Sequence, residues 1–334
     1  MGARVLVVKL SSLGDVVHTM PAVQDLRAAL PAVQIDWVVE SGLAPLAQCC
    51  EGVHRVIACD LRRWRKAPFA AQTRREWRAF RADLRREAYD AVIDLQGLSK
   101  SALVARMAQL APGGKRYALA NRTEGSSYEA PTRWVADVAV AIEPHIHAVQ
   151  RSRVLCAGVF GYALPDLMRF GLVAPGQRAQ PAIEKGATAS GGEVALVHGS
   201  SRDDKLWPEA HWLELGRRLL EAGFTLGLPH GSEAECARSH RLAATLGPRA
   251  QVWPRLDLAE LTDRLAGGAG VIGVDSGLSH IAVALDLPHV QLYNFDTAWR
   301  TGPLGQVRQR SVFGQPSPPL DAVWQAWQQV SEAA

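Results

Sequence analysis

Short apolar runs of strand length alternate along the chain with longer segments in which apolar residues recur at helical spacing. In the first half, strands are predicted at residues 5–10, 35–40, 55–58 and 91–95, and helices at 16–30, 69–86, 98–110, 131–142 and 148–160. In the second half, strands are predicted at 194–198, 224–228, 251–253, 271–274 and 290–293, and helices at 208–222, 232–246, 258–265, 281–285 and 320–330. This alternation is typical of βαβ units with a parallel sheet. It predicts an α/β fold of doubly wound sheets.

The pattern stops once, at residues 171–192, and then restarts. This stretch is rich in Gly, Pro, Ala and Ser, a composition typical of an interdomain linker. A chain of 334 residues is long enough for two domains of ordinary size. We therefore expect an N-terminal domain at residues 1–170, a C-terminal domain at 193–318 and a final helical segment at 319–334, with a cleft between the two domains.

Composition narrows the class of protein. The five cysteines are scattered and lack CxxC spacing, which favours reduced thiols in a cytoplasm over disulfides or a zinc site. No apolar run is long enough to span a membrane, and the N-terminus is charged too early for a signal peptide. A net charge of +4 is too small to indicate a nucleic-acid partner by itself.

The most informative stretch is residues 271–280, where an apolar run ends abruptly in Asp275-Ser276-Gly277 and a helix follows. Such a corner points backbone N–H groups and the positive end of a helix dipole towards a ligand at the carboxyl edge of the sheet. Gly277 allows close approach of a ligand, and His280 lies one turn further on. The alternative is an ordinary corner in which Ser276 caps the helix.

A second corner opens the chain, where the strand at residues 5–10 is followed by Ser12 and Asp15. The spacing of these two residues fits a capping box, which is the structural interpretation. The functional interpretation is that Asp15 is a carboxylate at the mouth of the sheet, available as a general base. The spacing alone does not decide between them.

Two further turns in the second half carry candidate groups. After the strand at 194–198, Ser200, Ser201 and Lys205 offer two hydroxyls and a cation for a phosphate. The alternative is a solvated turn in which the cations pair with the neighbouring Asp203 and Asp204. In the next corner, Glu235 could accept hydrogen bonds from ligand hydroxyls or serve only as a partner of the helix dipole.

Residues 62–86 are strongly basic, with ten Lys or Arg against two acidic residues, a local net charge of +8. Four aromatic residues lie among them: Trp64, Phe69, Trp77 and Phe80. Three interpretations compete: a solvated helix face, a surface for anionic lipid headgroups or an anionic substrate, and, least favoured, a nucleic-acid site, because no RNA-binding signature accompanies the charge. No Asp-x-Asp pair occurs in the chain, which argues against a carboxylate-held metal.

Three motifs in order resemble the lipopolysaccharide heptosyltransferases of glycosyltransferase family 9. They are Lys9-Leu-Ser-Ser-Leu-Gly-Asp15-Val-Val-His-Thr-Met-Pro21, Arg202-Asp-Asp-Lys205-Leu-Trp-Pro208 and Val274-Asp-Ser-Gly-Leu-Ser-His280, and the Arg62-Arg-Trp-Arg-Lys66 stretch is also similar. The resemblance implies a GT-B fold, with two Rossmann-like domains facing across a cleft and a C-terminal helix returning to the first domain. It implies inverting, metal-independent transfer of L-glycero-D-manno-heptose from ADP-heptose to the Kdo of Kdo2-lipid A.

The resemblance also implies roles for individual residues. Asp15 would be the general base, and Lys205 would act with it on the donor side. The donor would be bound by Ser200, Ser201, Lys205, Glu235, Leu256, Asp275, Ser276, Gly277 and His280. The acceptor would be bound by Ser11, Ser12, Gly14, Arg62, Arg63, Lys66, Gln96 and Lys100.

The expected partners are the Kdo2-lipid A acceptor and the inner face of the cytoplasmic membrane, where the protein would be peripheral. We expect no cofactor beyond the donor ADP-heptose, no metal, no nucleic acid and no obligate protein partner. Three alternatives stay open: a related transferase acting on another core acceptor, a nucleotide-sugar epimerase or hydrolase of the same fold, and a basic RNA-binding protein without enzymatic activity.

Overall fold

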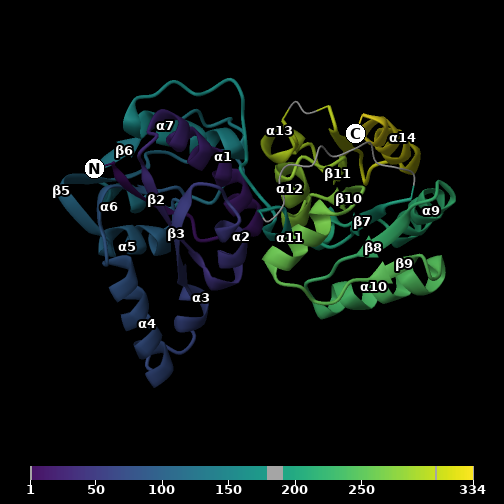
Figure 1. Ribbon diagram of the computed structural model, residues 1–334, viewed down its shortest axis with the longest axis horizontal. Helices are drawn as coiled ribbons and strands as arrows, with labels where there is room; N and C mark the ends of the chain where they lie inside the picture. The colour runs from purple at the N-terminus through teal and green to yellow at the C-terminus, as the bar shows by residue number, and fades with distance from the viewer. Residues whose placement is uncertain (1, 179–190, 305–306, 334) are drawn as a thin grey trace. The chain divides into compact units, whose positions relative to one another are not determined.

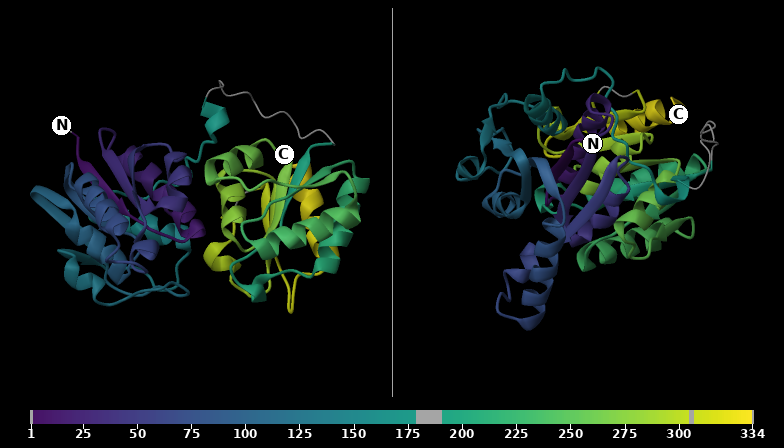
Figure 2. Two further views of the ribbon diagram at one scale, coloured as in Figure 1. Left: turned by 90° about the horizontal axis from the view of Figure 1, so that it is seen from below. Right: turned by 60° about the vertical axis from the view of Figure 1, so that its left-hand side comes forward.

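The computed structural model describes residues 2–178, 191–304 and 307–333. The chain divides into two compact units, Met1–Leu172 and Val173–Ala334. Each unit is a six-stranded sheet in which the paired strands are parallel, with helices on both faces (Figures 1 and 2). The linker expected at residues 171–192 lies mostly outside the described residues, and the boundary between the units falls near its start.

The sheet of the first unit has the strand order β3-β2-β1-β4-β5-β6. Its strands are β1 (Arg4–Val8), β2 (Gln34–Glu40), β3 (Val53–Cys59), β4 (Ala88–Asp94), β5 (Gln109–Leu119) and β6 (Val138–Val140). The order reverses between β1 and β4, and ligands of such sheets bind at the carboxyl ends of the strands next to this point. Val5, Leu6, Val7 and Val8 of β1 are fully buried, as expected for a central strand covered on both faces.

The helices of the first unit are α1 (Leu13–Ala29), η1 (Ser41–Leu43), α2 (Ala44–Gln48), α3 (Leu61–Trp64), α4 (Ala71–Leu84), α5 (Ser99–Met107), α6 (Thr132–Val135) and α7 (Ala148–Phe160). Helices α3 and α4 form an arm that extends away from the sheet (Figures 1 and 2). The prediction of a helix at residues 131–142 is wrong for the second half of this range. Residues 138–140 form the edge strand β6 instead, because this β-branched run pairs with Tyr117, Ala118 and Leu119 of β5.

The second unit repeats the arrangement with the order β12-β11-β10-β7-β8-β9. Its strands are β7 (Glu193–Val197), β8 (Thr225–Leu228), β9 (Ala250–Val252), β10 (Gly270–Val274), β11 (His289–Tyr293) and β12 (Gln309–Phe313). Its helices are α8 (Pro175–Arg178), η2 (Asp203–Lys205), α9 (Glu209–Glu221), α10 (Glu233–Leu246), α11 (Leu258–Ala266), α12 (Gly277–Ala284), α13 (Ala298–Thr301) and α14 (Leu320–Glu332). Both units therefore have the strand order of a Rossmann-like sheet.

The last helix, α14, differs from the expectation. We expected the segment at residues 319–334 to return to the N-terminal domain, but the buried face of α14 belongs to the core of the second unit. Val323, Ala326, Trp327 and Val330 are buried there, and the helix packs against β11, β12 and α9. The apolar stripe on this helix explains its position, because burying that stripe against the sheet removes it from water.

Candidate functional site

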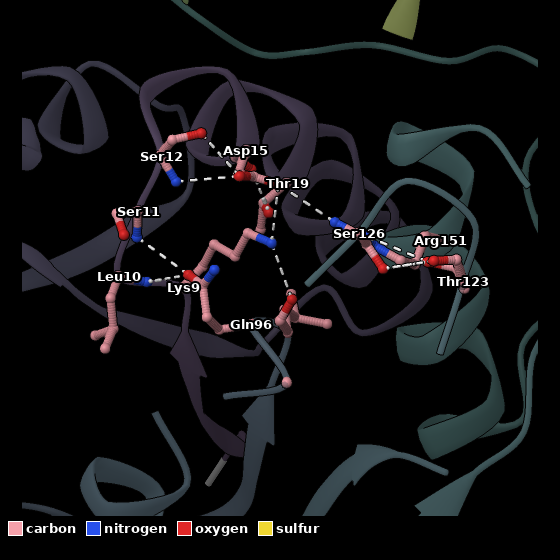
Figure 3. Close-up of polar contacts among 12 residues, drawn as sticks. Lys9, Leu10, Ser11, Ser12, Asp15, Thr19, Gln96, Thr123, Ser126 and Arg151 are labelled. Carbon is pink, nitrogen blue, oxygen red and sulfur yellow. Dashed lines mark hydrogen bonds and ion pairs between the residues drawn. The ribbon is translucent and has the colours of Figure 1, made fainter. Parts of the chain in front are cut away.

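In the first unit, the Asp15 side chain lies in the first turn of α1, just beyond the end of β1 (Figure 3). Its Oδ2 accepts hydrogen bonds from the Ser12 backbone N–H, with N and Oδ2 3.1 Å apart, and from the Ser12 hydroxyl at 2.8 Å. Its Oδ1 lies 3.4 Å from Lys9 Nζ and 3.3 Å from Arg151 Nη2. The capping box is therefore present. The same carboxylate also forms ion pairs with two cations, which capping the helix does not require.

The charge state of Asp15 follows from these neighbours. Burial alone would raise the pKa of the carboxyl, but Lys9, Arg151 and the Ser12 donors outweigh that effect and hold the pKa well below its usual range. The side chain is still 32% exposed, so a substrate can reach it. Asp15 is thus an ionised and accessible carboxylate at neutral pH. A general base of low pKa is always ionised at neutral pH but is intrinsically weak. Its contribution to the rate therefore depends more on the position of its oxygen atoms than on its basicity.

Several expected acceptor-binding residues gather at the same edge of the sheet (Figure 3). Gln96 Oε1 accepts hydrogen bonds from the backbone N–H groups of Leu10 and Ser11, each at 3.1 Å. The Ser11 hydroxyl oxygen lies 3.3 Å from Lys100 Nζ and 3.5 Å from Arg62 Nη2. Ser11, Gln96, Lys100 and Arg62 are thereby brought together from three segments of the chain. Gly14 lies within the first turn of α1.

Two other expected acceptor contacts are placed differently. The Arg63 guanidinium pairs with Asp60 at 2.8 Å and with Glu76 at 2.5 Å, so its charge is held within the arm. Lys66 is exposed, in the segment between α3 and α4. Their roles in binding the acceptor stay predictions.

The four aromatic residues of the arm lie in different environments. Trp64, Trp77 and Phe80 pack on one another with ring centroids 5.6–5.9 Å apart, and Trp64 Nε1 donates a hydrogen bond to Glu76. Trp64 and Phe80 belong to the buried core of the first unit, and Trp77 packs against it. Phe69, in contrast, is 86% exposed. All ten basic residues of positions 62–86 are exposed as well.

In the second unit, the corner between β10 and α12 is organised around Asp275, which is 6% exposed. Lys205 Nζ lies 2.6 Å from Asp275 Oδ2, and His280 Nε2 lies 3.4 Å from Oδ1. Gln291 Nε2 and the Thr301 hydroxyl approach the same Oδ1 at 3.3 and 3.4 Å. Burial alone would raise the pKa of Asp275, but His280 and Lys205 hold it well below its usual range. Lys205, Asp275 and His280 are therefore brought together as expected.

The alternative interpretation of the turn after β7 holds only in part. Arg202 pairs with Asp204 within the turn, whereas Lys205 reaches out of it to Asp275. The Ser200 hydroxyl oxygen accepts a hydrogen bond from the Arg202 backbone N–H at 3.4 Å, and Ser201 is exposed. The turn thus presents hydroxyl groups beside a fixed lysine.

Ser276 precedes α12 but does not cap it with its side chain. Among the described residues its hydroxyl oxygen is buried and has no hydrogen-bond partner. A buried polar atom without a partner is costly, so a ligand that supplies one is favoured at this position. The first residue of α12 is Gly277, which leaves space for such a ligand next to the start of the helix.

The two remaining donor-side candidates lie at the same edge of the second sheet. Glu235 Oε2 accepts hydrogen bonds from the backbone N–H groups of Gly231 and Ser232, at 2.7 and 3.2 Å, so this carboxylate caps the start of α10. Its Oε1 lies against Gly199, where an added β-carbon would be only 2.4 Å away. Leu256 is half-buried in the loop between β9 and α11.

Comparisons with known proteins identify the family of this chain. The sequence model of glycosyltransferase family 9 (heptosyltransferase) matches residues 77–319. This chain belongs to glycosyltransferase family 9. Lipopolysaccharide heptosyltransferase 1 of Pseudomonas aeruginosa is 41% identical over 311 residues, covering 91% of this chain and 82% of that protein.

Solved structures of the family agree with the fold. E. coli heptosyltransferase WaaC with ADP superimposes with a TM-score of 0.85 at 35% identity, covering 98% of this chain and 99% of that one. The same enzyme with ADP-2-deoxy-2-fluoro heptose gives a TM-score of 0.81 at 35% identity, covering 99% and 100%. The prediction of two Rossmann-like domains of the GT-B fold is confirmed, and the chain is a glycosyltransferase.

Four neighbours of the two carboxylates were assigned no role from the sequence: Lys9 and Arg151 beside Asp15, and Gln291 and Thr301 beside Asp275. Two of them leave a signal in the sequence. Lys9 follows the apolar run of β1 directly, and Gln291 interrupts the apolar run of β11, yet both are buried. Buried polar residues in such runs are uncommon unless they are paired. Arg151 and Thr301 are recognisable only once the fold brings their helices to the site.

Two further findings concern the described residues alone. Within residues 2–178, 191–304 and 307–333, no three His, Cys, Asp or Glu side chains gather where they could hold a metal ion. In the same part of the chain, no helix is both long enough and apolar enough to cross a membrane.

Proposed function

We propose that this chain is an inverting transferase that moves L-glycero-D-manno-heptose from ADP-heptose to the Kdo of Kdo2-lipid A, without a metal. The observation that carries the proposal is the Asp15 carboxylate, ionised and one-third exposed at the edge of the first sheet, in a chain that belongs to the heptosyltransferase family. The names of similar proteins support it, since one is a lipopolysaccharide heptosyltransferase 1 and another was solved with ADP.

On the acceptor side, the proposed step begins at Asp15. The acceptor hydroxyl gives its proton to the carboxylate while its oxygen forms a bond to the anomeric carbon of the heptose. The bond from that carbon to the diphosphate breaks, and ADP leaves with the electron pair. Attack from the face opposite the leaving group inverts the anomeric configuration. A positioned general base typically contributes ~10²–10⁴-fold to such a step.

On the donor side, the second unit stabilises the departing diphosphate. Lys205 is held by Asp275, but an ammonium carries three N–H donors and only one is directed to that carboxylate. The Ser276 hydroxyl and the start of α12 supply further donors of fixed position. Donors placed before the reaction begins need no reorganisation as charge develops on ADP.

The acceptor is anionic, and its binding site is proposed from positive charge. Arg62 and Lys100, both next to Ser11, suit the carboxylates of Kdo. The exposed cations of the arm suit lipid A phosphates and the anionic headgroups of the inner membrane face, with Phe69 at the apolar boundary. We therefore propose that the protein acts in the cytoplasm as a peripheral protein at this membrane.

The test is to incubate the protein with ADP-heptose and acyl-free Kdo2-lipid A, and to analyse the products by mass spectrometry and NMR. We expect an acceptor mass increased by one heptose and an inverted anomeric centre. Preference for an acceptor that already carries heptose would indicate a related transferase of the same family. Consumption of ADP-heptose without acceptor would indicate a hydrolase, and an isomerised nucleotide sugar would indicate an epimerase.

A further inference from the structure

Lys9 is a buried lysine whose ammonium is fixed from several sides. It follows β1 directly and is 1% exposed. Its Nζ donates a hydrogen bond to the Leu95 carbonyl oxygen at 3.0 Å and lies 3.4 Å from Asp15 Oδ1. Its backbone is tied to β2, because its N–H donates to Val38 and its carbonyl oxygen accepts from Trp37 Nε1. The ammonium is therefore held in place by the sheet itself.

Stability does not explain a lysine at this position. Burial lowers the pKa of Lys9 from 10.5 to about 8, although Asp15 acts in the opposite direction. The charged groups that act on it come from three elements: Asp15 from α1, Arg151 from α7 and Asp94 from β4. An apolar side chain of similar size usually serves a core at least as well as a buried ion pair. The position of Lys9 is explained instead by what it does to Asp15.

The two oxygens of Asp15 are in different surroundings. Oδ1 is held by Lys9 and Arg151, whose side chains are 1% and 10% exposed. Oδ2 is held by the backbone N–H and the hydroxyl of Ser12, which is exposed. A carboxylate has about four lone-pair sites, so these four donors occupy it fully. Of the four, only the Ser12 hydroxyl can turn away without moving a backbone or a buried charge.

We propose that Lys9 is the positioning residue of the catalytic base: it holds Asp15 Oδ1 inward, so that Oδ2 faces the acceptor and receives its proton. The inference rests on the proposed function, in which Asp15 is the base. In the step, the acceptor hydroxyl replaces the Ser12 hydroxyl at Oδ2. The acceptor O–H bond breaks, an O–H bond forms on Oδ2, and the electron pair of the acceptor oxygen forms the bond to the sugar. Lys9 touches neither substrate.

The test is the variant Lys9→Met, which keeps the length of the side chain and removes its charge. We expect kcat to fall ~10–100-fold, a part of the effect of a general base, with the KM for ADP-heptose unchanged. Without the neighbouring ammonium, the pKa of Asp15 should rise, so the acid limb of the pH profile of kcat/KM should move to higher pH. Lys115→Met, an exposed position on β5, is the matched control and should leave both readouts at wild-type values.

If the role of Lys9 were purely structural, Lys9→Met would lower the thermal stability of the protein without moving the acid limb of its pH profile. An acid limb of Lys9→Met that coincides with wild type, or a loss confined to KM, would overturn the proposal. If Lys9→Met does not fold, titration of the Asp15 carboxyl by carbon NMR in the wild-type protein decides, using Asp15→Asn to assign the signal. A signal that titrates near the ordinary value, about 4, would then reject the role of Lys9.

Different results would overturn the assignment of Asp15 as the base and the inference about Lys9. If Asp15→Asn keeps wild-type turnover, the assignment of Asp15 as the base fails, whatever Lys9 does. If Asp15→Asn is inactive while Lys9→Met keeps both kcat and the acid limb, only the inference about Lys9 fails.

Discussion

Replacement of Lys205 by methionine would remove the cation that lies 2.6 Å from Asp275 Oδ2. The Asp275 carboxylate is 6% exposed and would keep three weaker partners, all at Oδ1: His280 at 3.4 Å, Gln291 at 3.3 Å and the Thr301 hydroxyl at 3.4 Å. The variant therefore leaves a buried negative charge without its nearest cation. It should lower both the stability of the second unit and the rate of donor turnover.

The size of the stability loss follows from the burial of the pair. Removing one partner from a fully buried ion pair costs roughly 3–5 kcal/mol. The Lys205 side chain is 21% exposed, and Asp275 keeps other donors, so we expect a smaller loss of roughly 1–3 kcal/mol. For a domain of this size, that corresponds to a fall in Tm of roughly 3–10 °C. Loss of one preorganised donor to the diphosphate should lower kcat/KM for ADP-heptose by ~10²–10³.

The assays are differential scanning calorimetry and steady-state kinetics, with the double variant Lys205→Met/Asp275→Asn as the control. The double variant removes both charges, so it should regain most of the lost Tm, but it should not regain activity. A Lys205→Met variant with wild-type Tm and wild-type kcat/KM would refute this account of the pair. A double variant less stable than the single variant would show that the buried charge of Asp275 is not the cause of the loss.

Three further predictions follow from the first unit. Arg62→Ala should raise the KM for the acceptor more than Arg63→Ala, because the Arg63 guanidinium is held within the arm; equal KM values would contradict this. Phe69→Ser should weaken binding to vesicles that contain anionic phospholipid, measured by cosedimentation, because it removes the exposed ring among the cations of the arm; unchanged binding would speak against that role. Burial raises the pKa of Asp94 from 3.8 to about 6, so the folded form binds more protons than the unfolded form between these values. Wild-type stability should therefore fall relative to Asp94→Asn as the pH rises through this window, and parallel curves of Tm against pH would oppose this.

The fold could be predicted largely from buried strands. The runs that became β1, β4, β7, β10 and β11 are apolar because parallel strands at the centre of a sheet are covered on both faces. The strands β5 and β12 were not predicted. Residues 112–114 interrupt β5 with proline and two glycines, and β12 begins with Gln-Arg-Ser, so neither shows the apolar run of a central strand.

The site could be predicted only as far as local sequence determines it. Each strand–turn–helix corner is visible in the sequence because its turn and helix start are contiguous. The contact between Asp15 and Arg151 joins residues 136 positions apart and depends on the packing of α1 against α7. Likewise, Gln291 and Thr301 reach Asp275 from β11 and α13. Long-range packing of this kind leaves no periodic signal, so these contacts of Asp15 and Asp275 with distant residues appear only in the structure.

The central claim, that Asp15 is the base in an acceptor-dependent heptosyl transfer, is tested most directly by ADP release. The rate is measured from ADP-heptose with and without acyl-free Kdo2-lipid A, for the wild-type protein and for Asp15→Asn. We expect release only when acceptor is present, and a fall of at least ~100-fold in the rate of the variant. Release without acceptor, or a variant as fast as wild type, would contradict it.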